Sequence, residues 1–469
     1  MFARAHRLVK TLLLLLVLSA IRSAEAHEAL DQRVDDFVRA EMQRQHVPGV
    51  AIGIVKNGAI VKAQGYGYAN LEHQVPVGPA TIFQSGSVGK QITAMAVMLQ
   101  VEDGKLSLSD PMTKFFPEAP EAWRSITVYH LLTHTSGVPE YDNGTFDYRK
   151  DHTEDDLARF ACALPLEFPA GARWSYSNTG YVLLGIIVHK VSGSFYGDVL
   201  AARVFKPLGM TTARVISEAD IIPDRAAGYR LVNGEVKNQE WVSPVTNTTA
   251  DGCLYVSLRD LIAWDAGVRG RALLKPESWE LILRPARLNS GRSYPYGFGW
   301  GLDERGGQPL HQHGGGWQGF RSQFSRYVGE DLSIIVLANL AQADPARIAD
   351  GIAAIMSPKL AVPPARPIVD REPEVTARLS RLLDEARAGM LAPGAFAYVR
   401  AGFFPNGAKR IQERLLRLGP AQRLVLVGRE ELGDDRVFTY EVVFSGCTMI
   451  CTVALAPDGR LTQFRIQEK

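Results

Sequence analysis

The sequence contains little cysteine, no strong excess of one charge and none of the common metal-binding patterns. Only four cysteines occur in 469 residues, which is too few for a disulfide scaffold. They form no CxxC or Cys/His cluster typical of zinc sites, and the ten histidines include no HExxH sequence. Basic and acidic side chains nearly balance at 52 and 50, without the basic excess of nucleic-acid-binding domains. We therefore expect no metal, no cofactor and no nucleic-acid partner.

The sequence also lacks a run of about 18 consecutive apolar residues, which a transmembrane helix would require. The apolar run at residues 12–21 is shorter, follows Arg4, Arg7 and Lys10, and precedes a small-x-small sequence. This order is typical of a secretory signal peptide. We predict that residues 1–26 are removed on export, and that the mature protein is periplasmic or secreted without stable insertion in a membrane. An uncleaved anchor is the alternative.

Strand patterns lie near both ends of a long first segment, with helical patterns between them. Residues 50–55 and 60–64 flank the dipeptide Asn-Gly, which is a strong hairpin signal. Strand-like runs return at residues 320–327 and 333–338. We predict one domain over residues 27–356, with a helical lobe and a groove between lobe and sheet. The expected helices cover residues 30–45, 88–102, 127–132, 153–162, 178–192, 195–206, 257–268 and 345–356.

A proline-rich segment separates this domain from a second, smaller one. Repeated prolines in residues 357–372 block helix and sheet and predict a linker. Residues 373–469 read as a small α+β domain, in which we find no group of residues that points to chemistry. Its expected helices cover residues 375–390 and 408–418, and its expected strands cover residues 422–429, 436–444, 449–456 and 461–467.

Ser87-Val88-Gly89-Lys90 is the only place where a lysine follows a serine by three residues. The spacing places Lys90 over Ser87 on one face of a helix that begins here. A serine hydroxyl needs a nearby base to become a good nucleophile, and a helix start favours developing negative charge. The alternative is a helix-capping serine beside a solvated lysine. However, a lysine in the first turn opposes the helix dipole, and the apolar residues that follow at helical spacing predict a buried helix.

Tyr176-Ser177-Asn178 is a candidate partner sequence for Ser87. Two other Tyr-x-Asn sequences begin at Tyr68 and Tyr141, so the pattern alone does not decide. Tyr176 lies at a predicted loop-to-helix junction, whereas Tyr68 falls in a strand-to-loop run and Tyr141 in a polar loop. Nearby cations could lower the phenol pKa from its reference value of about 10, and Asn178 could orient a substrate amide. The alternative is a turn tyrosine followed by a helix cap.

A third candidate sequence, His313-Gly314-Gly315-Gly316, precedes the strand pair. Its glycines let the backbone approach a ligand closely and free N–H groups to bind an oxyanion. His311, two residues upstream, is a rival to His313. The alternative is a flexible turn with a surface histidine.

In this order, the three sequences resemble the motifs of the serine β-lactamase and penicillin-binding protein superfamily. The Tyr-x-Asn form is similar to the class C β-lactamase branch and its relatives, which include DD-peptidases, D-aminopeptidases and family VIII esterases. The resemblance covers about residues 30–356 and leaves the smaller domain outside. Further matching blocks lie at residues 104–111, 131–137, 207–210 and 296–300.

The resemblance implies an α/β (α+β) fold with an antiparallel sheet flanked by helices and a helical lobe. It implies an acyl-enzyme on Ser87, with Lys90 and Tyr176 as the proton-handling pair; which of the two is the base stays open. The N–H groups of Ser87 and Gly316 would form the oxyanion hole. The implied substrate-binding residues are Asn178, His313, Gly315 and Gly316.

One departure from the family pattern bears on the substrate. Where β-lactamases of this branch carry Lys-Thr-Gly, this chain has His313-Gly314-Gly315. Histidine is mostly neutral near pH 7, so its grip on a substrate carboxylate should be weaker than that of lysine. We therefore predict an exported serine hydrolase for peptidoglycan-type D-amino-acid peptides or small esters. The alternatives are a β-lactamase with a class C-like mechanism and a non-catalytic penicillin-binding or scaffolding protein.

Overall fold

The computed structural model describes residues 28–141, 146–215, 219–244, 246–400 and 403–468. The predicted signal peptide, residues 1–26, lies outside this set. None of the helices within these ranges is long and apolar enough to cross a membrane. All four cysteines are free, and Cys253 and Cys451 are buried.

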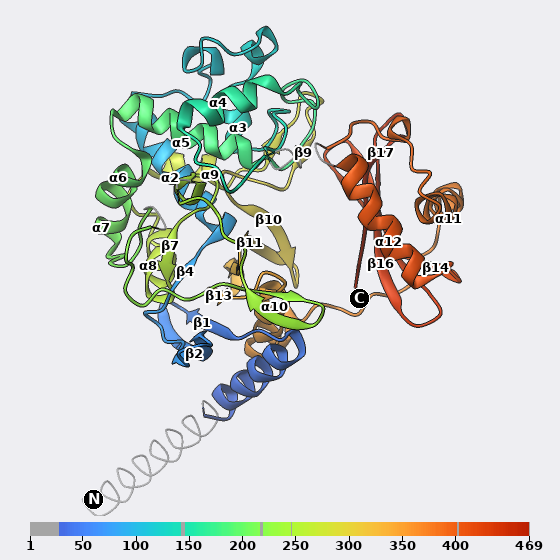
Figure 1. Cartoon of the computed structure of the whole chain (residues 1–469), viewed down its shortest axis with the longest axis horizontal. Helices are drawn as coiled ribbons and strands as arrows, with labels where there is room; N and C mark the ends of the chain where they lie inside the picture. The colour runs from blue at the N-terminus through green and yellow to red at the C-terminus, as the bar shows by residue number, and fades with distance from the viewer. Residues whose placement is uncertain (1–27, 142–145, 216–218, 245, 401–402, 469) are drawn as a thin grey trace, which may run out of the picture.

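A seven-stranded antiparallel sheet runs through the first domain, which confirms the antiparallel sheet that the resemblance implied (Figure 1). The expected hairpin is the β1–β2 pair, and β1 also pairs with β13, so that Val50 lies opposite Ala338. The two ends of the first domain therefore meet in one sheet. In spatial order, the strands are β10 (Gly301–Arg305), β11 (Gln308–Trp317), β12 (Phe320–Tyr327), β13 (Leu332–Ala338), β1 (Gly49–Lys56), β2 (Ala59–Asn70) and β3 (Val75–Pro76).

Each face of this sheet packs against its own set of helices. Along β13, Ile334 and Val336 join one apolar core, whereas Ile335 and Leu337 join another, because successive side chains of a strand point to opposite faces. The first core contains α10 and the helix over residues 28–45; the second contains the helical lobe. The helices are α2 (Gly89–Glu102), α3 (Val128–Leu132), α4 (Glu154–Ala163), α5 (Asn178–Ser192), α6 (Tyr196–Leu200), α7 (Lys206–Leu208), α8 (Leu258–Arg269), α9 (Pro276–Ile282) and α10 (Pro345–Met356).

Short strands occur in the segments that connect these elements. The predicted helix over residues 195–206 is α6 followed by a π-helical turn, Ala201–Phe205, and then by α7. The short strands are β4 (Ile82–Gln84), β5 (Tyr229–Val232), β6 (Glu235–Asn238), β7 (Tyr255–Ser257), β8 (Ala286–Arg287) and β9 (Ser293–Tyr294).

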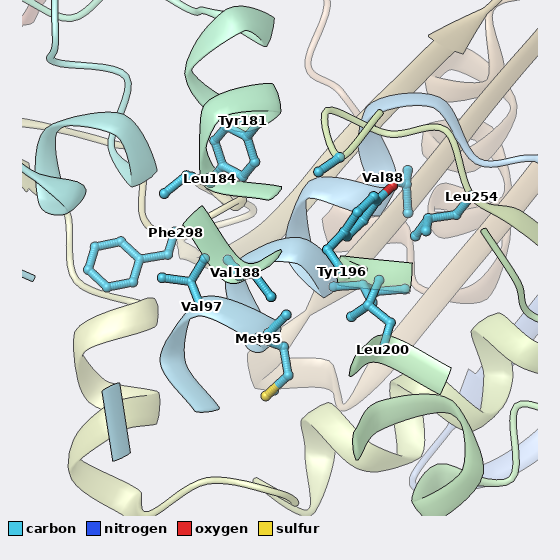
Figure 2. Close-up of a cluster of buried hydrophobic side chains, with 14 of the residues drawn as sticks. Val88, Met95, Val97, Tyr181, Leu184, Val188, Tyr196, Leu200, Leu254 and Phe298 are labelled. Carbon is cyan, nitrogen blue, oxygen red and sulfur yellow. The ribbon is translucent and has the colours of Figure 1, made fainter. Parts of the chain in front are cut away.

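Helix α2 runs through the interior of the lobe rather than along its surface. The apolar spacing predicted one buried face, but every residue from 89 to 100 is buried. A helix that is apolar on most sides is expected to be enclosed by other elements. Figure 2 shows the cluster around it, in which Met95 and Val97 of α2 lie among side chains that include Leu184 and Val188 of α5. This enclosure fixes the helix on which Lys90 stands.

The C-terminal residues form a four-stranded antiparallel sheet with two helices and a core of their own (Figure 1). Apart from a short turn at Pro358–Leu360, residues 357–372 contain no regular element. The domain boundaries proposed from the sequence stay a prediction. The elements of the C-terminal unit are α11 (Pro373–Arg387), α12 (Ala408–Leu418), β14 (Arg423–Leu432), β15 (Asp435–Val443), β16 (Thr448–Leu455) and β17 (Leu461–Glu468).

The C-terminal unit contacts the first domain through ion pairs and aromatic rings. Arg173 pairs with Asp435 at 3.0 Å, and Arg292 pairs with Glu431 at 2.7 Å. The Phe168 ring lies 5.5 Å from that of Tyr398, measured between centroids. Phe168 is only eight positions from Tyr176, so this interface lies close in sequence to one of the candidate site residues.

Candidate active site

Ser87 lies in a tight turn between strand β4 and helix α2. The turn is a single 3₁₀ element, Gly86–Val88, and Gly86 adopts a φ of +51°, which favours glycine. The interpretation of Ser87 as a helix cap is wrong, because α2 begins at Gly89 with Val88 in the capping position and no side-chain capping bond. The Ser87 hydroxyl is therefore available for other contacts.

Lys90 is fully buried and contacts Ser87 directly. Its Nζ lies 3.0 Å from Ser87 Oγ and 2.6 Å from Asn178 Oδ1, and it also donates to the backbone carbonyl of Asp251. The interpretation of Lys90 as a solvated lysine is wrong, since its relative exposure is 0%. The structure thus brings together three of the predicted site residues.

The three contacts of Lys90 fit a neutral amine as well as an ammonium. The Asn178 Oδ1 and Asp251 carbonyl oxygens can only accept, so each takes one N–H of Lys90. The third direction points at Ser87 Oγ, which can either accept a third N–H or donate its own proton to the amine lone pair. This arrangement can take the hydroxyl proton without moving a heavy atom.

The orientation of the Asn178 amide is set by Glu140. Glu140 accepts from the backbone N–H of Asn178 at 3.0 and 3.1 Å and from its Nδ2 at 3.1 Å. An ionised carboxylate has no proton to donate, so Nδ2 faces Glu140 and Oδ1 faces Lys90. Asn178 is the first residue of α5 and not its cap; Ser177 caps the helix by accepting from the Gly180 N–H at 3.1 Å.

Tyr176 packs its ring against Lys90. Lys90 Nζ lies 4.9 Å from the centroid of the Tyr176 ring, which is a cation–π distance. The centroids of the His134 and Tyr176 rings are 4.3 Å apart. The Tyr176 hydroxyl makes no hydrogen bond with any other residue that the structure describes. Tyr176 is therefore adjacent to the Ser87–Lys90 pair, through its ring rather than through its oxygen.

The other two Tyr-x-Asn sequences lie in different settings. Tyr68 is 43% exposed on β2. Tyr141, which the sequence placed in a polar loop, is instead buried and donates to Asp251 Oδ2 at 2.9 Å. The two residues that follow Tyr141 lie outside the described residues.

His313 is buried in strand β11, so its interpretation as a surface histidine in a flexible turn is wrong. Its Nε2 lies 2.9 Å from the Tyr296 hydroxyl, which in turn lies 3.2 Å from His134 Nε2. The backbone N–H of Ser177 donates to His134 Nδ1 at 3.1 Å. His134 must then carry its proton on Nε2 when neutral, and it donates to Tyr296, which donates to His313.

Both ring nitrogens of His313 are engaged by this chain of hydrogen bonds. Its Nδ1 lies 2.6 Å from the Gly314 carbonyl, to which it donates. Burial, and secondarily the charge of Lys90, lower the His313 pKa to about 4. His313 is thus neutral near pH 7 and presents no cation. Burial likewise lowers the pKa of its rival His311 to about 4, and His311 lies in the part of β11 that pairs with β10.

The glycines of β11 allow the strand to touch the turn that carries Ser87. A Cβ atom on Gly315 would lie 2.1 Å from the Ser85 carbonyl oxygen and 3.1 Å from Ser87 N. A Cβ atom on Gly86 would lie 2.4 Å from Gly316 N. Since only glycine fits this backbone contact, the N–H groups of Ser87 and Gly316 are brought close together at the end of the strand.

A cavity of about 310 Å³ opens at this point. Pairing of β10 with β11 ends at Gln312, which leaves the edge of residues 313–317 unpaired on that side among the described strands. Of the predicted site residues, Ser87, Asn178 and Gly316 line the cavity, whereas Lys90, Tyr176, His313 and Gly315 are not part of its lining. The full lining is Gly86, Ser87, Tyr141, Tyr148, Asn178, Asp251, Gly252, Gly316, Trp317, Gln318, Arg321 and Ala341.

Several residues of this site were not singled out from the sequence. His134 and Tyr296 do fall within blocks that resemble the family, at residues 131–137 and 296–300, so a signal for them existed. Glu140 lies three residues beyond the first block and carries no pattern of its own.

Within the described ranges, no group of three or more His, Cys, Asp and Glu side chains could hold a metal ion.

Comparison with known proteins places this arrangement in a family. The Beta-lactamase family matches residues 34–355, which is more than half of the chain. Penicillin-binding protein 4* of Bacillus subtilis (strain 168) is 30% identical over 311 residues, which cover 60% of this chain and 68% of that protein. D-aminopeptidase of Gluconobacter oxydans (strain 621H) is 28% identical over 325 residues, 66% of this chain and 59% of that protein.

Solved structures share the fold. The octameric penicillin-binding protein homologue from Pyrococcus abyssi aligns over 93% of this chain and 99% of its own, with a TM-score of 0.62 and 25% identity. The D-amino acid amidase from Ochrobactrum anthropi SV3 aligns over 71% and 97%, with a TM-score of 0.60 and 24% identity. The chain belongs to the Beta-lactamase family and is a serine hydrolase of the serine β-lactamase and penicillin-binding protein superfamily.

Proposed function

We propose that the protein is an exported acyl hydrolase that works through an acyl-enzyme on Ser87 and acts on peptidoglycan-type D-amino-acid peptides or small esters. The observation that carries the proposal is the 3.0 Å contact between Lys90 Nζ and Ser87 Oγ, which supplies the hydroxyl with a base. The similarity to a D-aminopeptidase and a penicillin-binding protein supports peptide substrates. Export rests on the signal-like pattern of residues 1–26.

In acylation, Ser87 Oγ attacks the substrate carbonyl carbon while its proton passes to the Lys90–Tyr176 pair. The bond to the amine or alcohol leaving group then breaks, and that group takes the proton. Water attacks the ester of the acyl-enzyme in the second half-reaction, which releases the acid and restores Ser87. The N–H groups of Ser87 and Gly316 stabilise the oxyanion of both tetrahedral intermediates, a contribution of about 3 kcal/mol for one such donor.

The contacts favour Lys90 over Tyr176 as the first proton acceptor. Lys90 is within hydrogen-bond distance of Ser87, whereas the Tyr176 hydroxyl makes no such contact in this state. A tyrosine whose ring lies on Lys90 is well placed for the later transfer to the leaving group.

Efficient β-lactamase activity is not part of the proposal. A lysine in place of His313 would provide a fixed cation for the substrate carboxylate. His313 is neutral near pH 7, and both of its ring nitrogens are hydrogen-bonded to groups of the protein. Of the charged side chains that line the cavity, Arg321 is the one cation among the described residues.

Labelling with an active-site probe tests the proposal. Fluorescent penicillin or a fluorophosphonate should label the wild-type protein and not Ser87→Ala. Lys90→Met, which keeps the buried volume but removes the amine, should lower the labelling rate by about 100-fold or more, because a positioned base contributes a factor of about 100 to 10,000. Absence of labelling and of ester hydrolysis in the wild type would contradict the proposal.

A substrate panel separates the remaining alternatives. Nitrocefin, p-nitrophenyl esters of several chain lengths, D-Ala-D-Ala peptides and D-amino-acid amides should be compared on the purified protein. Turnover of the peptides or esters with slow nitrocefin hydrolysis is expected. Rapid nitrocefin hydrolysis would favour the β-lactamase alternative, and stable acylation without turnover would favour a penicillin-binding protein without hydrolytic activity.

A further inference from the structure

One arginine of the C-terminal unit reaches the active site of the first domain. Arg400 Nη2 donates to Glu140 Oε1 at 3.0 Å and to the backbone carbonyl of Tyr176 at 3.2 Å. It thereby contacts Glu140, which accepts hydrogen bonds from Asn178, and Tyr176, which lies two positions before Asn178. About half of the Arg400 side chain is exposed, at 49%, whereas that of Glu140 is 6% exposed.

The segment that carries Arg400 is anchored on both units. Ala397 N–H donates to the Leu461 carbonyl at 2.7 Å, which ties the segment to β17. Tyr398 stacks edge-on against Phe168 of the first domain, and the Arg173 guanidinium lies 5.5 Å above its ring. The backbone that leads to Arg400 is thus held by contacts that do not involve Glu140.

Burial and several neighbouring charges act on the pKa of the Glu140 carboxyl group. Burial raises its pKa, and Arg400, the Asn178 N–H and Lys90 lower it, while the charge of Asp251 raises it. Arg400 is the cation that forms an ion pair with it directly; Lys90 acts from further away, through Asn178. Without Arg400, a buried carboxylate would lose its paired charge, and the neutral acid would become the favoured form.

We propose that Arg400 is a positioning residue for the reaction at Ser87, because its ion pair with Glu140 fixes the side-chain amide of Asn178 against Lys90. The inference rests on the proposed function. A protonated Glu140 could donate a hydrogen bond, and the Asn178 amide could then turn its oxygen towards Glu140 and its NH₂ group towards Lys90. Lys90 would lose one of its two carbonyl acceptors, and its lone pair would no longer be directed at Ser87. The C-terminal unit would therefore complete the catalytic geometry from outside the hydrolase domain.

The pH dependence of ester hydrolysis tests this role. The catalytic geometry requires Glu140 as a carboxylate, so kcat should fall as the pH falls through the pKa of that group. Arg400→Ala raises this pKa and should move the acid limb of kcat towards higher pH by about one pH unit or more, with little change in KM. On the acid limb of the profile, well below this pKa, the loss of kcat should approach about tenfold, and on the alkaline side it should be small. The substrate is p-nitrophenyl acetate, assayed from pH 5 to 9 on the full chain.

Arg292→Ala provides a matched control. Arg292 joins the same two units by pairing with Glu431, and its side chain is 54% exposed, close to the 49% of Arg400. It makes no contact with Glu140, Tyr176 or Asn178. Its removal should leave the pH profile unchanged, whereas a loosened interface alone would shift both variants alike.

Two further variants separate positioning from folding. Arg400→Lys keeps the positive charge, so its kcat should depend on pH more nearly as in the wild type than that of Arg400→Ala does. If Arg400→Ala melts at a lower temperature than the wild type, Arg400→Gln is used in its place. Glu140→Gln cannot titrate, so Arg400→Ala should add little further loss in a Glu140→Gln background.

The proposal is overturned if Arg400→Ala and Arg400→Gln follow the wild-type pH profile, if Arg292→Ala shifts the profile equally, or if Arg400→Ala has its full effect in the Glu140→Gln background. Failure of the proposed function would look different: the wild type itself would neither hydrolyse the ester nor label at Ser87.

Discussion

At the scale of single residues, the site contains two buried basic side chains, Lys90 and His313, whose surroundings differ. Lys90 contacts three oxygens: Asn178 Oδ1 and the Asp251 carbonyl accept its N–H groups, and Ser87 Oγ lies in the third direction. His313 is connected through Tyr296 to His134, and burial, with the charge of Lys90 as a second cause, keeps it neutral near pH 7 by lowering its pKa. The proposed base therefore contacts Ser87 directly, whereas the neutral His313 ring is hydrogen-bonded within the protein.

The neutral state of His313 predicts a loss of stability in acid. Its pKa is lowered to about 4, below the unfolded reference of about 6.5. Above pH ~6.5 both states are neutral and its contribution is fully present; as the pH falls towards about 4, the unfolded state binds the proton first and stability is lost. The loss attributable to His313 is of the order of 3 kcal/mol.

Urea unfolding between pH 7 and pH 4 measures this effect. His313→Asn removes the titrating ring while keeping a polar side chain, so its free energy of unfolding should fall less steeply with acid than that of the wild type. His134 and His311 are present in both proteins and cancel in the comparison. Equal acid sensitivity of the two proteins would contradict the prediction.

At the scale of elements, the site depends on backbone contact between strand β11 and the turn that carries Ser87. The turn Gly86–Val88 and the glycines of β11 leave no room for a side chain between them. Glycine is a weak strand former, so the strand state of residues 314–316 comes from pairing with β12, in which Gly315 lies opposite Ser322. Pairing with β12 therefore outweighs the low strand preference of the three glycines. The same pairing holds the glycine backbone of β11 against the turn that carries Ser87.

Gly315→Ala should separate these two elements. The new Cβ would meet the Ser85 carbonyl oxygen at 2.1 Å and Ser322 Oγ at 2.2 Å, so the backbone must shift. Displacing one oxyanion donor should lower kcat for p-nitrophenyl acetate by about 100-fold, the effect of losing such a donor elsewhere. Gly78→Ala is the control, because a Cβ there would meet no atom within 4 Å. Wild-type kcat in Gly315→Ala would contradict the prediction.

At the scale of the whole molecule, the chain contains separate apolar cores joined by a polar interface. The C-terminal core, which includes Leu379 and Tyr440, shares no residue with the apolar cores of the first domain. Ion pairs such as Arg173–Asp435 and Arg400–Glu140 connect the units. Interfaces of this kind contribute less to cooperativity than a shared core does.

Differential scanning calorimetry should therefore resolve two unfolding transitions. Leu379 is 1% exposed in α11, and Leu379→Ala should destabilise the C-terminal transition by about 2–5 kcal/mol, the usual cost of a large-to-small change in a core. The transition of the first domain should move much less. A single transition that shifts as a whole would show that the two units unfold together.

The local sequence sufficed to predict much of the fold. The Asn57-Gly58 dipeptide between apolar alternations predicted the β1–β2 hairpin, and the observed α12 coincides with the helix expected over residues 408–418. The antiparallel sheet and the superfamily were implied by the ordered motifs and are confirmed. The strand β11 was not predicted, because three glycines in a row give no strand signal.

The sequence by itself determined that Ser87 and Lys90 would meet, because three positions on a helical path bring two side chains to one face. Only the tertiary structure decided what surrounds them. Glu140 and Arg400 are 260 positions apart, and Asn178 and Lys90 are 88 apart, so no local pattern relates them. Their contacts arise from the packing of α2 against α5 and from the docking of the C-terminal unit. Spacing along the chain specified the contact between the proposed nucleophile and its proposed base, and long-range packing specified the charged residues near them.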